Sequence, residues 1–387
     1  MSNTCVSDAV RYIGVNDRTI DLFESQYPVP NGISYNSYII FDEKIAVMDT
    51  VDARATGTWL ENLTDALDGR KPDYLVVLHM EPDHAANIER FIGLYPEAKI
   101  VGNAKTFAMI NQFFTLDLAD RKVEVKEGAV LSLGSHTLQF VMAPMVHWPE
   151  VMVAYEQSEK ILFSADAFGK FGALDASEPW DEEAARYYLN IVGKYGAQVQ
   201  ALLKKAAALD IGMICPLHGP VLKENLEHYI GKYQTWSSYE PEVHGVLVAF
   251  ASIHGHTAEA AEKMAELLRA AGEEHVEALD LARTEVSLAV RKAFYYDRIV
   301  LAACTYDGGV FPCMEEFLLH LKTKNWQKRK VGLIENGSWA PMAAKVMRGI
   351  LEPMKAIEIA EPVVTIKSAL NAASLEAMKQ LAAAIVG

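Results

Sequence analysis

The amino-acid sequence predicts a two-domain α/β protein, with a layered αββα sandwich in residues 1–240 and a doubly wound parallel sheet in residues 245–387. The first region holds many short apolar segments separated by turns, whereas the second alternates apolar strands with amphipathic helices. A polar stretch that carries Pro241, residues 233–245, separates the two patterns. We therefore expect the domain boundary to lie in this stretch.

In the first region, short apolar runs that end at turn residues predict strands, and longer periodic runs predict helices. Residues 35–50 predict a hairpin whose turn contains Asp42, Glu43 and Lys44. Further strands are expected within residues 73–79, 98–103, 137–144, 151–166 and 210–220, and helices over 55–67 and 87–95. This mixture favours two packed sheets with helices on their outer faces.

The second region alternates strictly between the two kinds of element. Strands are expected at 245–252, 275–282, 298–305, 330–336 and 358–366. Helices are expected at 257–272, 287–296, 312–324, 340–354 and 374–387, the first of them ended by Gly272. Alternation of this kind predicts a parallel sheet of about five strands with helices on both faces, for which the flavodoxin-like strand order is one common solution.

The composition excludes several classes of protein. The 387 residues are 51% hydrophobic, which argues against long disordered stretches, and the formal net charge of −15 argues against nucleic-acid binding. No apolar run is long enough to span a bilayer, and the N-terminus shows no signal-peptide pattern. The cysteines form no Cys-x-x-Cys pair, so neither a zinc knuckle nor a rubredoxin-type iron site is expected, and scattered thiols favour a reducing cytoplasm. They are Cys5, Cys215, Cys304 and Cys313.

The segment His-Met-Glu-Pro-Asp-His, residues 79–84, places four metal-ligand side chains directly after an apolar run. A loop at a strand end can direct alternate side chains into one cavity, so this segment can serve two adjacent ions. Other candidate ligands follow other expected strands in the same region. The complete candidate set is His79, Glu81, Asp83, His84, His147, Asp166 and His218.

Charge balance supports a site for two ions. Two divalent ions bring four positive charges, which three carboxylates and one bridging hydroxide offset, so that a buried cluster is nearly neutral. Each residue has a simpler alternative role: a single His or Asp at a strand end usually makes a turn or a hydrogen bond, and residues 79–84 alone could form an exposed polar turn. The occurrence of all seven residues in one domain favours the metal site.

A second candidate site follows the strands of the second region. Ser252-Ile253-His254-Gly255-His256-Thr257 lies between the first strand and its helix, where amide and hydroxyl groups can cradle a phosphate. The loops after the third and fourth strands open onto the same edge of a doubly wound sheet. The further candidates there are Thr305, Tyr306, Asp307, Gly308, Asn336, Gly337, Ser338 and Trp339. A helix-capping turn is the alternative for the first loop, and a buried core position is the alternative for Trp339.

These motifs resemble those of the flavodiiron proteins, also called A-type flavoproteins, and the resemblance covers essentially the whole chain. The first region resembles the metallo-β-lactamase fold, but Glu81 stands where the hydrolases of that fold carry a second histidine. The second region resembles a flavodoxin, with departures from the usual pattern at His254, at Ala303-Cys304 and around residues 337–339. These departures bear on the ring contacts and on the potential of the flavin.

The resemblance implies the cofactors and the ligand roles. His79, Glu81 and His147 would bind one iron, Asp83, His84 and His218 the other, and Asp166 would bridge them, while the second domain would bind FMN. The implied reaction is reduction of O2 to water, of NO to N2O, or of both. The implied partners are a donor such as rubredoxin or a reduced deazaflavin, and a second copy of the chain in a head-to-tail homodimer or a dimer of dimers.

Two other functions are compatible with parts of the sequence. One is a zinc-dependent hydrolase of the metallo-β-lactamase class, against which Glu81 and the second domain argue. The other is a flavin electron carrier with a structural metal domain, against which the number of ligands argues, because a closed structural site needs only four.

Overall fold

The computed structural model describes residues 5–118 and 120–387, which form two compact units. The first unit comprises Met1–Tyr188 and Tyr195–Gln234, and the second comprises Leu189–Lys194 and Thr235–Gly387. The short segment that joins the second unit is tied to it by a hydrogen bond from Asn190 Nδ2 to the Ser287 carbonyl at 3.2 Å. Among the described residues, none of the helices combines the length and the apolar character that crossing a membrane requires.

The first unit is built on two sheets. In sheet order, the six-stranded sheet contains β1 (Val10–Tyr12), β6 (Tyr38–Ile40), β7 (Ala46–Met48), β8 (Tyr74–Val76), β9 (Lys99–Gly102) and β10 (Lys122–Glu124). The five-stranded sheet contains β11 (Val130–Ser132), β12 (Thr137–Met142), β13 (Met152–Glu156), β14 (Ile161–Phe163) and β15 (Met213–Cys215). Two small hairpin-like pairs are β2 (Val15–Asp17) with β5 (Ile33–Tyr35), and β3 (Leu22–Phe23) with β4 (Tyr27–Pro28).

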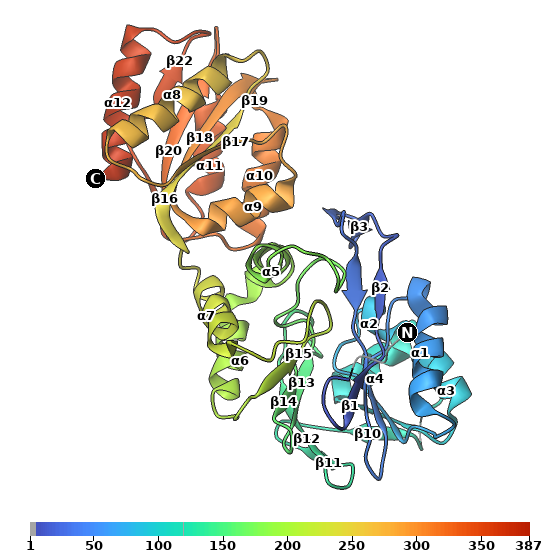
Figure 1. The fold of residues 1–387 in the computed structure, drawn as a ribbon. Helices are drawn as coiled ribbons and strands as arrows, with labels where there is room; N and C mark the ends of the chain where they lie inside the picture. The colour runs from blue at the N-terminus through green and yellow to red at the C-terminus, as the bar shows by residue number, and fades with distance from the viewer. Residues whose placement is uncertain (1–4, 119) are drawn as a thin grey trace. The chain divides into compact units, whose positions relative to one another are not determined.

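Helices cover the outer faces of these sheets. Figure 1 shows α1 and α3 outside the six-stranded sheet and α6 and α7 outside the other, and α4 packs against β9. The helices of this unit are α1 (Thr56–Leu67), α2 (Pro82–Ala85), α3 (Ile88–Leu94), α4 (Ala104–Phe113), α5 (Trp180–Tyr187), α6 (Gly196–Ala206) and α7 (Leu226–Ser237). The αββα layering predicted from the sequence is therefore confirmed, and β6 and β7 form the predicted antiparallel hairpin.

The second unit is a parallel sheet in the order β17-β16-β18-β20, with β21 and β22 both paired to β20. Its strands are β16 (Val243–Ala251), β17 (Val276–Asp280), β18 (Tyr296–Tyr306), β20 (Arg329–Asn336), β21 (Ile357–Ile359) and β22 (Val364–Ile366), and β19 (Gly309–Val310) folds back on β18. Numbered within the unit, this order is 2-1-3-4-5, so the flavodoxin-like prediction is confirmed.

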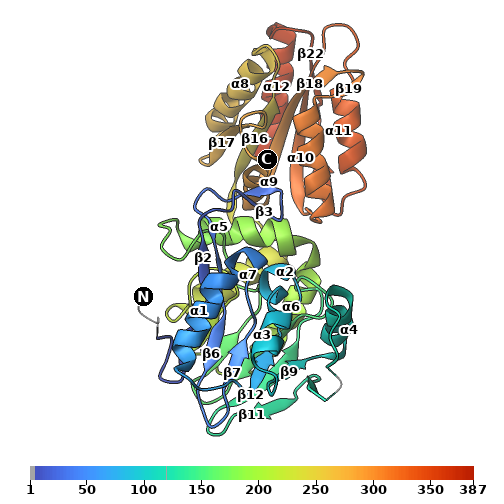
Figure 2. The same cartoon turned by 90° about the vertical axis from the view of Figure 1, so that its right-hand side faces the viewer.

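Helices lie on both faces of this sheet, as Figure 2 shows. One face carries α8 (His256–Ala270) and α12 (Ala372–Val386); the other carries α9 (Val286–Tyr295), α10 (Pro312–Thr323) and α11 (Ala343–Leu351). The buried residues of α8 recur every three or four positions, which places one apolar stripe against the sheet. They are Thr257, Ala260, Ala261, Met264, Ala265 and Leu268.

Two expectations need correction. The stretch 233–245 is not a linker throughout, because α7 continues to Ser237 and β16 begins at Val243. Its aromatic residues Tyr233 and Trp236 are 0% and 3% exposed, so the helix end is anchored in a core. The single strand expected at 358–366 is two short strands, because Pro362 between them has no N–H to donate to a neighbouring strand.

Candidate metal centre and cofactor pocket

The segment His79–His84 leaves β8 and turns directly into α2. Glu81 is the N-cap residue of α2 and Pro82 occupies its first turn, where proline is favoured because no intrahelical N–H is lost. Asp83 and His84 then lie on the helix itself. His79, Asp83 and His84 are all buried, so the alternative of an exposed polar turn is wrong.

The other three candidates follow the ends of strands in the five-stranded sheet. His147 follows β12, Asp166 follows β14 and His218 follows β15. These three strands run in the same direction, because β13 is antiparallel to both β12 and β14, and β14 is parallel to β15. Their carboxyl ends therefore meet at one edge of the sheet and bring the three side chains to one place.

The seven side chains form two groups. His79, Glu81, His147 and Asp166 offer ligand atoms that lie within 4.8 Å of one another, and so do Asp83, His84 and His218. The two oxygens of Asp166 face different groups. Oδ2 lies 3.3 Å from His79 Nε2 and 3.0 Å from His147 Nε2, whereas Oδ1 lies 3.3 Å from His84 Nε2. This is the arrangement that a bridging carboxylate requires.

The chemistry of these atoms fits a pair of cations. Both carboxylate oxygens of Asp83 and of Asp166, and Nε2 of His147, are buried without a hydrogen-bond partner of acceptable geometry. His84 Nε2 and His218 Nε2 approach to 3.1 Å. Converging acceptors cannot satisfy one another, but metal ions between them would satisfy all of them. Imidazole nitrogens with several carboxylate oxygens suit iron, while a set rich in carboxylates is less typical of zinc.

The imidazole and carboxylate groups of the cluster strongly shift one another's pKa values. Burial lowers the pKa of His84, but Asp83 and Asp166 reverse the shift and raise this pKa to about 10. Burial likewise opposes protonation of His147, but the carboxylates of Asp166 and Glu81, 3.0 and 2.9 Å from its Nε2, raise its pKa to about 9. Burial raises the pKa of Asp166, but His79 and His147 outweigh it and hold this pKa well below its usual range. The carboxylates of the cluster therefore stabilise positive charge placed between them, as on a protonated imidazole or a cation.

A small opening leads to the cluster. Glu81 and Asp83 line a cavity of about 180 Å³ together with Phe23, Tyr35 and Arg54. On the inner side, aromatic rings surround His218, with ring centroids of Phe23 at 5.4 Å and of Tyr187 at 5.5 Å. Aromatic side chains thus pack against the cluster, and Glu81 and Asp83 connect it to a small cavity. The sequence reading missed this aromatic packing, because no local motif marks it.

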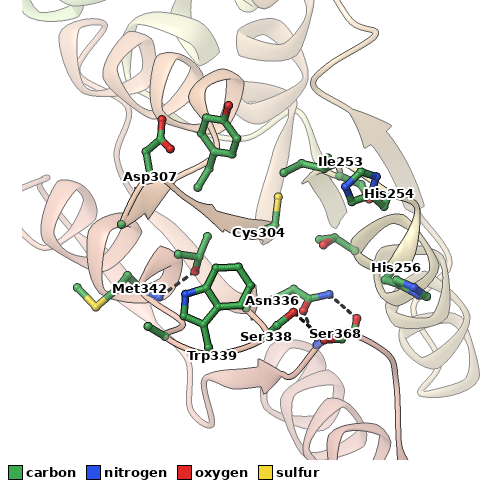
Figure 3. Close-up of a pocket in the computed structure, with 17 residues that line it drawn as sticks. Ile253, His254, His256, Cys304, Asp307, Asn336, Ser338, Trp339, Met342 and Ser368 are labelled. Atoms are coloured by element: carbon green, nitrogen blue, oxygen red, sulfur yellow. Dashed lines mark hydrogen bonds between the residues drawn. The ribbon is translucent and has the colours of Figure 1, made fainter.

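The second unit contains a larger cavity of about 620 Å³ at the carboxyl ends of its strands, within the size range of cofactor sites. It is lined by all the predicted residues of the second site except Gly255. Figure 3 shows its polar and aromatic side chains around the cavity. The four additional lining residues are Cys304, Ala340, Met342 and Ser368. Ser368 follows β22, so the strand-end rule applied to the last strand would have found it.

The beginning of α8 has the geometry of a phosphate cradle. Gly255 is the N-cap residue at φ +95° and its N–H donates to Ser252 Oγ at 3.2 Å. Thr257, in the first turn, is 3% exposed and lines the cavity. Thr305 Oγ1 accepts the N–H groups of Met342 and Ala343 at 2.9 and 3.2 Å, which connects two of the lining loops.

Trp339 lies at the rim of this cavity and is 90% exposed, so the alternative of a core tryptophan is wrong. An exposed indole beside a cavity can cover a flat aromatic ligand. Ser338 and Ser368, on adjoining loops, hydrogen-bond through their hydroxyls at 2.7 Å and support the same rim. The cavity thus combines a helix N-terminus for an anion with an aromatic side chain for a ring.

Each of the two units matches a known protein family. Residues 33–219 match the ODP family beta lactamase model and residues 247–368 match a flavodoxin domain model. The rubredoxin-oxygen oxidoreductase of Megalodesulfovibrio gigas is 28% identical, with 100% of this chain and 98% of that protein covered. The nitric oxide reductase of Moorella thermoacetica is 28% identical, with 94% of this chain and 92% of that protein covered.

The solved structure of a rubredoxin oxygen:oxidoreductase from Desulfovibrio gigas aligns with a TM-score of 0.92 at 28% identity, and covers 99% of this chain and 97% of that one. Other relatives are longer: the chain spans 41% of diflavin flavoprotein A 1 of Synechocystis, at 30% identity over 59% of its own length. Both family models occur in this order over the chain, and the full-length likeness extends across both units. The chain belongs to the flavodiiron proteins.

Proposed function

We propose that this chain is a flavodiiron oxidoreductase, which passes electrons from FMN to a pair of irons and reduces O2 to water, NO to N2O, or both. The observation that carries the proposal is the position of Asp166, whose two oxygens face two separate groups of ligand-type side chains. The names of the two full-length relatives support both gases as substrates.

The ligand roles follow the two groups. His79, Glu81 and His147 would hold one iron, Asp83, His84 and His218 would hold the other, and Asp166 would contribute one oxygen to each. When bound, reduced FMN and two ferrous ions would each supply two electrons, which together equal the four that reduction of O2 to two waters needs. The carboxylates offset the charge of the ions, and the opening beside Glu81 and Asp83 admits the gas.

The pocket of the second unit would hold FMN. The start of α8, with Ser252, Gly255 and Thr257, would cradle the single phosphate, and Trp339 would cover the ring system. Of the remaining candidates, Ile253, His254 and His256 lie around the start of α8, and the others lie at or directly after the ends of β18 and β20. A single cradle favours FMN over FAD, because a dinucleotide needs contacts to a second phosphate and to an adenosine. FAD released from the native protein by denaturation and identified by chromatography would contradict this assignment.

The hydrolase alternative is less well supported. A hydrolytic site needs a metal-bound hydroxide but no electron carrier, and the second unit, with its flavodoxin family match, would then have no purpose. The carboxylate of Glu81 among the ligands is also better suited to a metal that cycles to the ferric state.

We further propose that the functional domains are residues 1–240 and 245–387 and that the protein works in the cytoplasm as a head-to-tail homodimer or a dimer of dimers. In that arrangement the flavin of one chain faces the irons of its partner. A rubredoxin is the donor that the name of the M. gigas relative suggests, with a reduced deazaflavin as the alternative.

Metal analysis and single turnover test the function. Protein from iron-replete cells should contain two irons per chain, and two zincs without iron would overturn the proposal. The anaerobically reduced protein should be reoxidised by O2, by NO, or by both, within one turnover. Reoxidation by neither gas would contradict an oxygen or nitric oxide reductase.

The substitution Asp166→Ala tests the bridge. It should abolish turnover and reduce bound iron, because neither group then has an oxygen shared with the other, while flavin content stays unchanged. Asp42→Ala is the matched control, since Asp42 is an aspartate with a side chain only 7% exposed that bonds to a histidine, His136 Nδ1 at 2.8 Å, outside the cluster. An active Asp166→Ala protein with full iron would refute the assigned role.

A further inference from the structure

Glu150 is a buried carboxylate that belongs to neither group of candidate ligands. It lies just before β13 and its side chain is 0% exposed. Its Oε1 is 2.8 Å from His79 Nδ1 and also accepts the N–H of Met80 at 2.8 Å. His79 Nε2, on the other side of the ring, faces Glu81 and Asp166 at 3.3 Å. The imidazole of His79 therefore connects Glu150 to the metal cluster.

In the part of the chain that the structure describes, two other histidines of the cluster, His84 and His218, do not have a carboxylate as the partner of Nδ1. His218 Nδ1 donates to the carbonyl oxygen of Ser34 at 2.7 Å, which is a neutral acceptor. His84 Nδ1 is buried and has no hydrogen-bond partner within residues 5–118 and 120–387. The two groups therefore differ, although both offer imidazole nitrogens. Nδ1 of His79 contacts a carboxylate, whereas Nδ1 of His84 and of His218 contacts none among the described residues.

A carboxylate behind a metal-bound imidazole has two physical effects. It fixes the proton on the outer nitrogen and the orientation of the ring, and it makes the inner nitrogen a stronger electron donor. Glu150 also contributes to the charge balance. Glu81, Asp83 and Asp166 offset three of the four positive charges of two ferrous ions, and the carboxylate of Glu150 is available to offset the fourth.

We propose that Glu150 is a positioning residue that holds the tautomer of His79 and makes the iron at His79, Glu81 and His147 the more electron-rich of the two. This inference rests on the proposed function, because it requires iron at both groups. The negative charge favours the ferric state of that iron, so Glu150 makes the two ions inequivalent and assigns the easier oxidation to one of them.

The substitution Glu150→Gln tests the charge separately from the shape. Glutamine keeps the length and an oxygen that accepts the His79 N–H, but it is neutral. The apparent iron affinity of the metal-free protein should fall by about tenfold to a hundredfold. The midpoint potential of the diiron couple should become more positive, because the ferric state loses its compensating charge. Flavin content and the flavin potential should stay unchanged.

Glu156→Gln is the matched control. Glu156 is also 0% exposed and lies at the far end of β13, where its carboxylate accepts the N–H groups of Ser158 and Glu159 at 2.9 and 2.6 Å. Its replacement removes the same buried charge from the same strand but should leave iron affinity and potential unchanged. Equal shifts in both variants, or no shift in Glu150→Gln, would overturn the role of Glu150.

Two further measurements separate this inference from its premises. Glu150→Asp retains the charge, so its potential should stay nearer to that of the unaltered protein than the potential of Glu150→Gln. The second measurement uses the unaltered protein loaded with cobalt(II), in which the proton on His79 Nδ1 should give a hyperfine-shifted NMR signal that exchanges slowly with water. If His79 Nδ1 carries no proton, the inference is wrong, and this test does not depend on whether Glu150→Gln folds. Failure of the unaltered protein to bind iron would instead reject the proposed function.

Discussion

The charges of individual carboxylates determine the pKa values of the histidines in the candidate metal cluster. His84 and His147 are buried beside carboxylates that raise their pKa values to about 10 and about 9, against about 6.5 in an unfolded chain. A metal ion must displace these protons before it can bind, so metal binding releases protons and strengthens as pH rises toward those values.

The same shifts predict how the stability of the metal-free protein depends on pH. A histidine whose pKa is raised on folding stabilises the folded state fully below its unfolded pKa, and this contribution is lost as pH rises through the folded pKa. The melting temperature of chelator-treated protein should therefore fall between about pH 7 and pH 10. Calorimetry at intervals of one pH unit measures it.

Two comparisons isolate the cause of that loss. Iron-loaded protein should lose less stability over the same range, because the ions hold the deprotonated ligands. Asp166→Asn should show a weaker pH dependence when metal-free, since Asp166 helps to raise both pKa values. A melting temperature of the metal-free protein that is constant or rises with pH would show that these histidines are not protonated in the folded state.

A second prediction at this scale concerns Thr257 in the first turn of α8. Thr257→Ala should weaken FMN binding by about tenfold to a hundredfold, because a hydrogen bond to a charged phosphate is lost. Ser374→Ala is the control: Ser374 also lies in the first turn of a helix, α12, and takes part in its capping box, but it does not line the pocket. Fluorescence titration of the flavin-free proteins measures both. Equal affinity of Thr257→Ala and the unaltered chain would mean that the cradle lies elsewhere.

At the scale of the element, the two ends of α8 offer a matched pair of glycines. Gly255 precedes the helix at φ +95° and Gly272 follows it at φ +101°, and an added Cβ would meet no atom within 4 Å at either position. Alanine at either position is strained only by its backbone conformation, so each substitution should destabilise the protein by about 1 kcal/mol.

Only one of the two substitutions should affect the flavin. Gly255→Ala distorts the turn between Ser252 and Thr257, both of which line the pocket, whereas Gly272→Ala distorts the other end of the helix. Thermal unfolding should give similar losses for both variants, and flavin titration should show weaker binding for Gly255→Ala alone. Similar flavin affinities in the two variants would remove the start of α8 from the proposed site.

At the scale of the whole molecule, the proposed head-to-tail homodimer can be tested with two defective chains. One chain carries Asp166→Ala, which disables the irons. The other carries Ser252→Ala with Thr257→Ala, or larger substitutions at these two positions, so that it binds no flavin. In a head-to-tail heterodimer the intact flavin faces the intact irons. Random pairing should then give about a quarter of the activity of the same amount of unaltered dimer. Half of the dimers are mixed, and each mixed dimer has one working pair of sites where the unaltered dimer has two.

Differently tagged chains allow the mixed dimers to be purified and verified. Each variant alone should be inactive in the same gas-reduction assay. If electrons instead pass within one chain, every chain contains one disabled site and the verified heterodimer stays inactive. That outcome would reject the head-to-tail arrangement but would leave the metal and flavin sites themselves in place.

Much of this architecture is determined by local patterns. Apolar runs that alternate with helices predicted a doubly wound parallel sheet, for which the observed 2-1-3-4-5 order is one common solution, and the position of His79–His84 after an apolar run marked it as the end of a strand. Strand-end residues were predictable as site candidates because the ends of parallel strands meet at one edge. The order of the elements, the candidate ligands and most of the pocket lining therefore follow from features that are contiguous in the chain.

Other features depend on contacts between distant segments, which no local pattern encodes. Glu150 meets His79 across 71 positions of the chain, and the carbonyl of Ser34 meets His218 across 184. The exposure of Trp339 and the inclusion of Ser368 in the pocket are decided by how separate loops close on one another. The sequence by itself determined which groups are available for metal and flavin chemistry, because residue type and position at strand ends are local. Only the tertiary structure decided which residues hydrogen-bond to these groups and how deeply they are buried, because burial and hydrogen-bond partners arise when distant strands pack together.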